Sequence, residues 1–159
     1  MRIPGRITAA IEILTEVFTR HRPASEALKD WGKAHRFAGG GDRHAIGTLV
    51  YDSLRKKNSA AHRMGADTPR ALVLATLHGA WGMAVHEIAA LADGEHGLQP
   101  LSDSERAALT RHVTDDPPHV AGNFPAFLTS SLTRVFGAEA AAEGAALAER
   151  APIDLRVNT

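Results

Sequence analysis

The chain lacks cysteine altogether. This absence excludes a disulfide scaffold, a cysteine zinc site and a cysteine nucleophile within these residues, and it is compatible with a reducing compartment. Long apolar runs are also missing, because no window approaches the ~18 consecutive apolar residues that a membrane helix needs. Glu12 and Glu16 interrupt the apolar positions near the N-terminus, so no signal-peptide core is present there. We therefore expect a cytoplasmic protein with no membrane partner.

Net charge is zero, but its distribution along the chain is uneven. Residues 1–63 hold 12 of the 18 Lys and Arg and 6 of the 18 Asp and Glu, whereas residues 64–159 hold the remaining 6 and 12. Such asymmetry can indicate one surface that meets a polyanion and another that meets something else. It can equally reflect two sets of solvated helices, and both interpretations stay open.

Helical periodicity dominates the first half of the chain. Apolar residues at helical spacing predict helices over 6–20 and 24–37. After a run of three glycines, Asp42 is expected to cap a third helix, because its carboxylate can accept hydrogen bonds from the free amides of the first turn. The apolar stripe of that third helix consists of Ile46, Leu49, Val50 and Leu54.

The second half continues in the same way. Thr68 and Pro69 are typical of a helix start, and the apolar helix that they open is expected to run through Trp81 and form the centre of the core. Ser102 and Glu105 have the spacing of a capping box, which predicts a helix through Leu109. Further helices are expected near 85–91, 128–136 and 138–150.

Residues 151–159 alternate apolar and polar side chains, which is a strand pattern. We interpret this segment as the first strand of a following mixed domain, at which the chain has been truncated. The predicted fold class is therefore all-α, with a helical domain over 1–150 and the start of another region over 151–159.

Searches for chemistry find no complete motif. The glycine run at 39–41 is not followed by the Lys and Ser or Thr of a phosphate loop. His86 and Glu87 begin like a zinc-protease helix, but Ala90 stands where the second histidine is required. We expect no metal site, and we assign no catalytic or cofactor-binding residue in this chain.

Basic residues form the remaining candidate site. Arg55, Lys56 and Lys57 follow one another at the end of the third helix, where the helix dipole alone favours cations by about 0.3–1 kcal/mol. Three cations in a row exceed what capping requires, and each could contact an RNA phosphate. Because aromatic residues are scarce, we expect recognition of backbone and shape rather than of bases. The predicted RNA-binding residues are Arg2, Arg6, Arg43, Arg55, Lys56, Lys57 and Arg63.

Two stretches resemble a known family. Residues 42–55, DRHAIGTLVYDSLR, resemble the D-R-x-x-I-x-x-L-V-Y-x-x-L-R helix of NusB-like domains. The stretch from Phe124 to Gly137, together with the terminal APIDLRVNT, resembles the linker of the Sun/NOP (RsmB-like) methyltransferases. In that family a NusB-like helical domain precedes a small mixed domain and a Rossmann-like domain that binds S-adenosylmethionine.

The resemblance implies a NusB-like helical bundle that recruits 16S ribosomal RNA for a cytosine-C5 methyltransferase. The implied partners are ribosomal RNA and the parent's own catalytic domain, and S-adenosylmethionine would be the parent's cofactor. Arg43 can instead be a structural residue paired with a buried carboxylate. The alternative function is a helical protein-interaction module. Whether the basic residues gather on one exposed face of the fold distinguishes the two functions.

Overall fold

The computed structural model describes residues 1–92, 97–114, 116–151 and 155–156. The chain forms two compact units, Met1–Asp115 and Asp116–Thr159. Every regular element within the described ranges is a helix, which confirms the all-α class. Of the strand predicted over 151–159, residues 152–154 and 157–159 lie outside the described residues, and no strand occurs at Ala151, Leu155 or Arg156. No helix in the described part is long and apolar enough to cross a bilayer.

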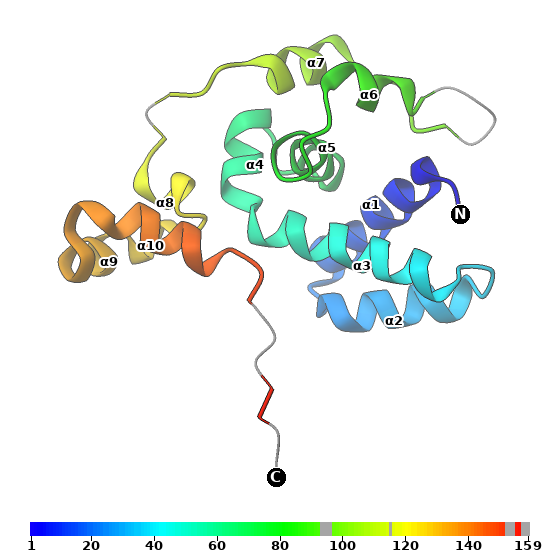
Figure 1. Cartoon of the computed structure of the whole chain (residues 1–159), viewed down its shortest axis with the longest axis horizontal. Helices are drawn as coiled ribbons and strands as arrows, with labels where there is room; N and C mark the ends of the chain where they lie inside the picture. The colour runs from blue at the N-terminus through cyan, green and yellow to red at the C-terminus, as the bar shows by residue number, and fades with distance from the viewer. Residues whose placement is uncertain (93–96, 115, 152–154, 157–159) are drawn as a thin grey trace. The chain divides into compact units, whose positions relative to one another are not determined.

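The longest helices lie in the first unit, and the second unit consists of short helices and 3-10 turns (Figure 1). In the first unit they are α1 (Ile3–Arg20), α2 (Ala24–Ala34), α3 (Gly40–Arg55), α4 (Lys57–Met64), α5 (Pro69–Gly79), α6 (Val85–Ala90) and α7 (Asp103–Thr110). In the second unit they are α8 (Pro118–Ala121), η1 (Ala126–Leu128), α9 (Thr129–Phe136), η2 (Gly137–Glu139) and α10 (Ala140–Leu147).

Helix α5 occupies the centre of the first unit. Its residues 71–77 are all buried, and it packs against α1, α3, α4, α6 and α7, which surround it in Figure 1. Thr68 caps the helix by accepting a hydrogen bond from the Ala71 amide, with Pro69 in the first turn, as the sequence predicted. A helix hydrophobic on all sides is stable only when neighbours cover it on all sides, and α5 meets that condition.

The prediction for Trp81 is wrong. Helix α5 ends at Gly79, and Gly82 has a φ of +70°, which turns the chain away from the helix axis. Trp81 lies in this turn with 41% of its surface exposed, and its indole Nε1 donates to Asp52 Oδ2 at 3.0 Å. The indole thus belongs to the surface of the first unit, because its N–H finds a carboxylate there.

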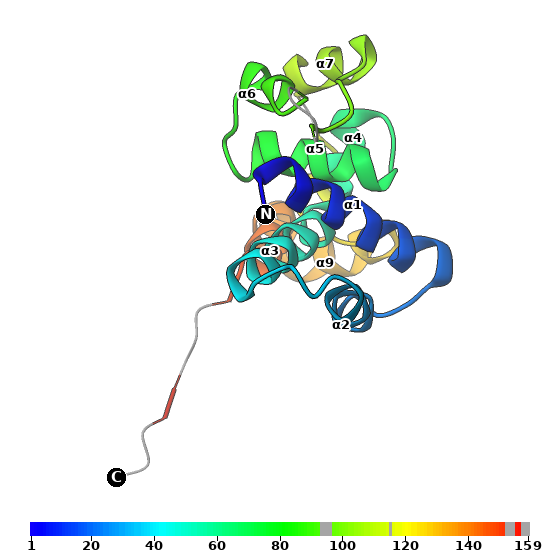
Figure 2. The same cartoon turned by 90° about the vertical axis from the view of Figure 1, so that its right-hand side faces the viewer.

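Helices α1, α2 and α3 lie side by side in both views, and α3 packs on α1 and α5 (Figure 2). The buried stripe of α3 contains Ile46, Leu49 and Val50, as its spacing predicted. Helix α2 contacts both α1 and α3, although only Ala27 and Gly32 of α2 are buried. Much of α2 is therefore surface, and its cationic residues face solvent.

The start of α3 differs from the prediction. Gly39 is the N-cap residue, and Asp42 stands at the third helical position, where its Oδ2 accepts the Gly39 amide at 3.2 Å. Asp42 also binds the terminal amine of Met1 and the guanidinium of Arg6. These partners hold the carboxylate one turn inside the helix, so the glycine run enters the helix rather than preceding it.

Two arginines join the ends of α4 and α7. Helix α4 was not predicted as a separate element, and it restarts at Lys57 immediately after α3. Near its end, Arg63 Nη1 donates to the carbonyls of Leu109 and Arg111, while Arg111 Nη2 donates to the carbonyls of His62 and Arg63. The ends of the two helices are thereby bound to each other through their free carbonyls.

In the second unit, α8 and α10 approach closely at two glycines. A Cβ on Gly144 would lie 2.4 Å from Phe124 Cδ1 and 2.8 Å from the Gly122 carbonyl oxygen. Both glycines are buried, as is Phe124. The packing of α8 against α10 therefore depends on the absence of a side chain at these positions. The predicted helix over 138–150 is confirmed in its central part as α10.

Candidate nucleic-acid interface

The predicted RNA-binding residues do not lie in one place. Arg6 and Arg43 lie near the start of α3, whereas Arg55 and Lys56 lie at its other end. Twelve helical residues separate Arg43 from Arg55, which corresponds to about 18 Å along the helix axis. Arg63 is a further two turns along α4, and Arg2 is the exposed N-cap residue of α1. The described structure thus divides the predicted site into several parts.

Arg6 is engaged by Asp42. Its Nε donates to Asp42 Oδ1 at 2.9 Å, and the terminal amine of Met1 lies 3.0 Å from Oδ2 of the same carboxylate. The hydrogen bond from the terminal amine, followed by those from Arg6 and the Gly39 amide, holds the pKa of Asp42 below its ordinary value. This arrangement ties α1 to the start of α3, so the Arg6 guanidinium is held by an ion pair within the fold.

The basic run at the α3–α4 junction also has structural contacts. Arg55 Nη1 donates to Asp52 Oδ1 at 2.9 Å, and Lys57 Nζ lies 4.7 Å from the centre of the Phe18 ring. Lys56 is the residue between the two helices and is half-buried. Arg63 donates to backbone carbonyls of the α7 end, as described above. These contacts bind most of the predicted cations within the fold.

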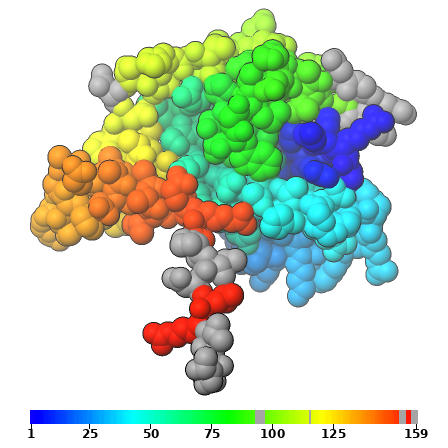
Figure 3. All heavy atoms as spheres, in the orientation of Figure 1, coloured from blue at the N-terminus to red at the C-terminus, as the bar shows by residue number. Residues whose placement is uncertain are grey.

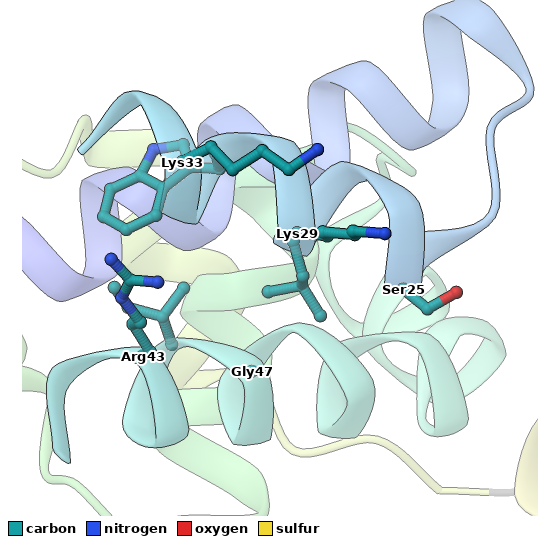
Figure 4. Close-up of a pocket in the computed structure, with 8 residues that line it drawn as sticks. Ser25, Lys29, Lys33, Arg43 and Gly47 are labelled. Carbon is teal, nitrogen blue, oxygen red and sulfur yellow. The ribbon is translucent and has the colours of Figure 1, made fainter. Parts of the chain in front are cut away.

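One cationic groove does form, between α2 and α3. Its volume is about 360 Å³, and its lining carries three cations and, among the described residues, no carboxylate. Figure 4 shows Lys29, Lys33 and Ser25 on α2, opposite Arg43 and Gly47 on α3. The groove is lined by Ser25, Leu28, Lys29, Trp31, Lys33, Arg43, Ile46 and Gly47.

Arg43 is the predicted residue that the groove retains. Its Nε donates to the Ala38 carbonyl at 2.9 Å, which fixes the guanidinium at the α2–α3 connection. A Cβ on Gly32 would lie 3.1 Å from Arg43 Nη1, so the side chain rests directly on the α2 backbone. The bond to Ala38 uses only one of the five guanidinium N–H groups, and the others remain available for an anion. The suggested buried carboxylate partner of Arg43 does not occur among its contacts in the described residues.

Lys29 and Lys33 complete the cationic lining. They are four residues apart on α2, which places both on one helix face, and both are exposed. Lys33 Nζ lies 3.3 Å from Asp30 Oδ1, but Asp30 is bound more closely by Arg22 at 2.6 Å. The hydrogen bond from Arg22, and secondarily that from Lys33, lowers the pKa of Asp30. Asp30 is thus largely balanced by Arg22, which leaves the groove cationic.

Lys29 and Lys33 are not among the residues predicted to bind RNA, because the periodicity of 24–37 indicated only a helix. Their spacing alone predicts a cationic helix face, since side chains at i and i+4 lie on the same face of a helix. What the sequence did not contain was the position of Arg43 opposite that face, which depends on how α2 and α3 pack. The run Arg55, Lys56, Lys57 was more conspicuous in the sequence but is more engaged in the structure.

The described residues offer no cluster of side chains for a metal ion. No three His, Asp or Glu side chains within the described ranges gather around a point where a cation would bind. The residues also do not fit a S-adenosylmethionine site of the Rossmann type, because that site requires a strand followed by a glycine-rich turn. The described elements are all helical.

Compared with known proteins, the chain matches no family model, no curated protein and no solved structure. The NusB-like and methyltransferase resemblance therefore rests on the residues quoted above.

Proposed function

We propose that this chain binds RNA through the α2–α3 groove and serves as the RNA-recruiting helical domain of a cytoplasmic, S-adenosylmethionine-dependent 16S rRNA cytosine-C5 methyltransferase. The observation that carries RNA binding is the groove itself, which presents Lys29, Lys33 and Arg43 from two packed helices. The resemblance of residues 42–55 to a NusB-like helix supports the methyltransferase context. The chemistry of methyl transfer belongs to the parent's catalytic domain, and no step of it is assigned to residues of this chain.

The arrangement suits a phosphate backbone. Two flexible ammonium groups stand opposite one planar guanidinium, which can bind a phosphate through two N–H groups. Ammonium and guanidinium groups bind the phosphate oxygens of any nucleotide, and Leu28, Ile46 and Gly47, which also line the groove, carry no hydrogen-bonding side chain. Recognition at this site is therefore expected to depend on charge and shape rather than on sequence.

The test is binding of a small-subunit ribosomal RNA fragment at 50 and 200 mM salt. Three phosphate contacts on single-stranded RNA contribute about 2 to the slope of log affinity against log salt. Replacing Lys29, Lys33 and Arg43 together by glutamine should remove that contribution. Over the fourfold salt range, wild-type affinity should then fall roughly 20-fold more than that of the variant.

The matched control replaces three exposed arginines outside the groove, Arg106, Arg134 and Arg150, by glutamine. The control and the groove variant change the net charge equally. If the slope of log affinity against log salt falls as much in the control as in the groove variant, RNA binding depends on overall charge and not on the groove. A second variant replaces Arg55, Lys56 and Lys57 by glutamine and tests the basic run that the sequence indicated. An unchanged slope in the groove variant would contradict the assignment of the groove.

A protein-interaction module is the second candidate. It is favoured by the exposed apolar side chains of the second unit, where Phe127 is 81% and Leu147 82% exposed. The dispersal of the predicted basic residues also favours it. Failure of the wild-type chain to bind RNA at 50 mM salt would make this the better assignment.

A further inference from the structure

Two of the chain's few aromatic residues are exposed and are connected through Asp52 and Arg55. Tyr51 is 38% exposed and lies on the C-terminal half of α3, and Trp81 is 41% exposed in the turn after α5. The Arg55 guanidinium carbon lies 5.8 Å from the centre of the Tyr51 ring. Asp52 joins the set, because Oδ1 accepts from Arg55 at 2.9 Å and Oδ2 accepts from Trp81 at 3.0 Å. These four side chains are linked by a series of contacts, from Tyr51 through Arg55 and Asp52 to Trp81.

The space-filling view agrees with this continuity. The green surface of the α5–α6 region borders the cyan surface of α3 on the face shown in Figure 3. Both segments belong to the first unit, and α3 packs against α5. We call the surface formed by Tyr51, Asp52, Arg55 and Trp81 the aromatic platform.

Trp81 is held in a fixed orientation. Its amide donates to the Thr76 carbonyl at 3.0 Å, and the Met83 amide donates to the Leu77 carbonyl at 3.0 Å. The His78 ring forms a hydrogen bond with the Met83 carbonyl at 2.9 Å, and Gly82 supplies the positive φ of the turn. With its indole N–H bound to Asp52, the ring keeps its position before any ligand arrives, which lowers the entropy cost of binding.

The chemistry of the platform fits an unpaired nucleobase. Proteins bind exposed bases by stacking them on aromatic rings and on guanidinium planes, and every base has a face suited to this. Tyr51 and Trp81 supply aromatic rings, and Arg55 supplies a guanidinium plane. Asp52 is engaged on both oxygens by the platform itself, so its charge is balanced by Arg55.

We propose that the aromatic platform stacks unpaired bases of single-stranded RNA, which makes the ligand class of this chain single-stranded rather than duplex RNA. The inference rests on the proposed RNA-binding function and adds a second, separate contact to it. It differs from the expectation of pure backbone recognition, which followed from the low number of aromatic residues. The fold brings two of these few residues onto one surface.

The experiment compares the tryptophan emission of the wild-type chain with that of Trp81→Phe, because the difference between the two reports on Trp81 while Trp31 in the groove is left unchanged. A single-stranded RNA 12-mer without self-complementarity is compared with a duplex of equal phosphate number. The single strand should quench Trp81 emission and bind more tightly than the duplex. In the otherwise wild-type chain, Trp81→Ala and Tyr51→Ala should each lower single-strand affinity roughly 5- to 150-fold. The salt slope should stay unchanged, because stacking releases no counterions.

Two further variants serve as controls. Phe127→Ala removes an exposed aromatic ring from the second unit and should leave affinity unchanged. Trp81→Phe loses the hydrogen bond to Asp52 but keeps an aromatic plane, so it should restore most of the affinity that Trp81→Ala loses. A merely structural role for Trp81 would not produce quenching or a preference for the single strand.

The outcomes separate the two proposals. If the groove variant weakens binding while Trp81→Ala and Tyr51→Ala do not, the platform proposal is wrong and the groove proposal stands. The same residue types are then better assigned to a protein partner, where Trp, Tyr and Arg dominate binding energy. Equal affinity for single strand and duplex, without quenching, would also overturn the platform. Absence of any RNA binding at low salt would overturn both proposals.

Discussion

Arg70 and Glu105 form the ion pair whose removal is most informative about the first unit. Arg70 Nε donates to Glu105 Oε1 at 2.6 Å and Nη2 to Oε2 at 3.1 Å, while Nη2 also reaches the carbonyls of Gln99 and Pro100. Glu105 in turn accepts the Ser102 amide at 2.8 Å and closes the capping box of α7. One carboxylate thus fixes the start of α7 against the start of α5.

The perturbation is Glu105→Gln. The amide keeps one acceptor oxygen but places an NH₂ group against a second donor, either the guanidinium or the Ser102 amide. Both side chains of the pair are only about one-fifth exposed, at 20% and 19%, so solvent replaces the lost bond poorly. A hydrogen bond to a charged group contributes about 1.5–3 kcal/mol. We expect Glu105→Gln to lower the free energy of unfolding by about 2 kcal/mol at pH 7.

The stability lost on Glu105→Gln should become smaller as the pH is lowered. The hydrogen bond from Arg70, supported by the Ser102 amide, holds the pKa of Glu105 below its ordinary value. A lowered folded-state pKa contributes stability that is present above the unfolded-state pKa of about 4.3 and is lost as pH falls through the folded-state pKa. The difference between wild type and Glu105→Gln should therefore be constant from pH 7 to about pH 5 and should already be smaller at about pH 4.

The assay is urea unfolding followed by far-UV circular dichroism at pH 7, 5 and 4. Glu87→Gln is the matched control, because Glu87 accepts the Ala84 amide at 2.7 Å in the capping box of α6, with no arginine partner among the described residues. Since glutamine also serves in a capping box, this control should change stability by less than about 0.5 kcal/mol. Equal effects of the two substitutions, or a difference that persists unchanged at pH 4, would refute the reasoning.

Two further predictions concern packing. Leu74→Ala, at a fully buried position of α5, should cost about 2–5 kcal/mol and lower the urea midpoint of the first unit; a cost under 1 kcal/mol would contradict the central place of α5. Gly144→Ala should cost about 1–3 kcal/mol, because the new methyl group meets Phe124 and the Gly122 carbonyl, and hydrogen exchange in α10 should accelerate. Gly41→Ala, with nothing within 4 Å, is the control and should be neutral or slightly stabilising.

The sequence predicted elements best where a local pattern determines them. Thr68 and Ser102 act as helix caps, and residues 71–77 form the buried helix, because capping and apolar periodicity depend on residues a few positions apart. The start of α3 was misplaced because Asp42 is held by Met1 and Arg6, whose proximity no local pattern encodes. Trp81 was misplaced for a similar reason, since its partner Asp52 is distant in sequence.

The candidate site was only partly predictable. Arg43 was identified from its helix, but its opposition to Lys29 and Lys33 results from the packing of α2 on α3. The basic run at 55–57 was conspicuous because its charges are consecutive, yet consecutive residues on a helix point in different directions. Lys57 accordingly lies over Phe18, while Arg55 turns to Asp52 and Tyr51.

The reciprocal arginines at the ends of α4 and α7 have an evolutionary consequence. Arg63 and Arg111 bind main-chain carbonyls, and a peptide carbonyl is present whatever side chain its residue carries. Substitution of His62 or Leu109 would leave these hydrogen bonds chemically intact, whereas loss of either arginine would remove two of them. Among homologous sequences, we therefore expect the two arginines to persist while His62 varies, and Leu109 to stay apolar because its side chain is buried in the core. An alignment of such sequences would then show no correlated substitutions between residues of α4 and residues of α7, although the two helices are in contact.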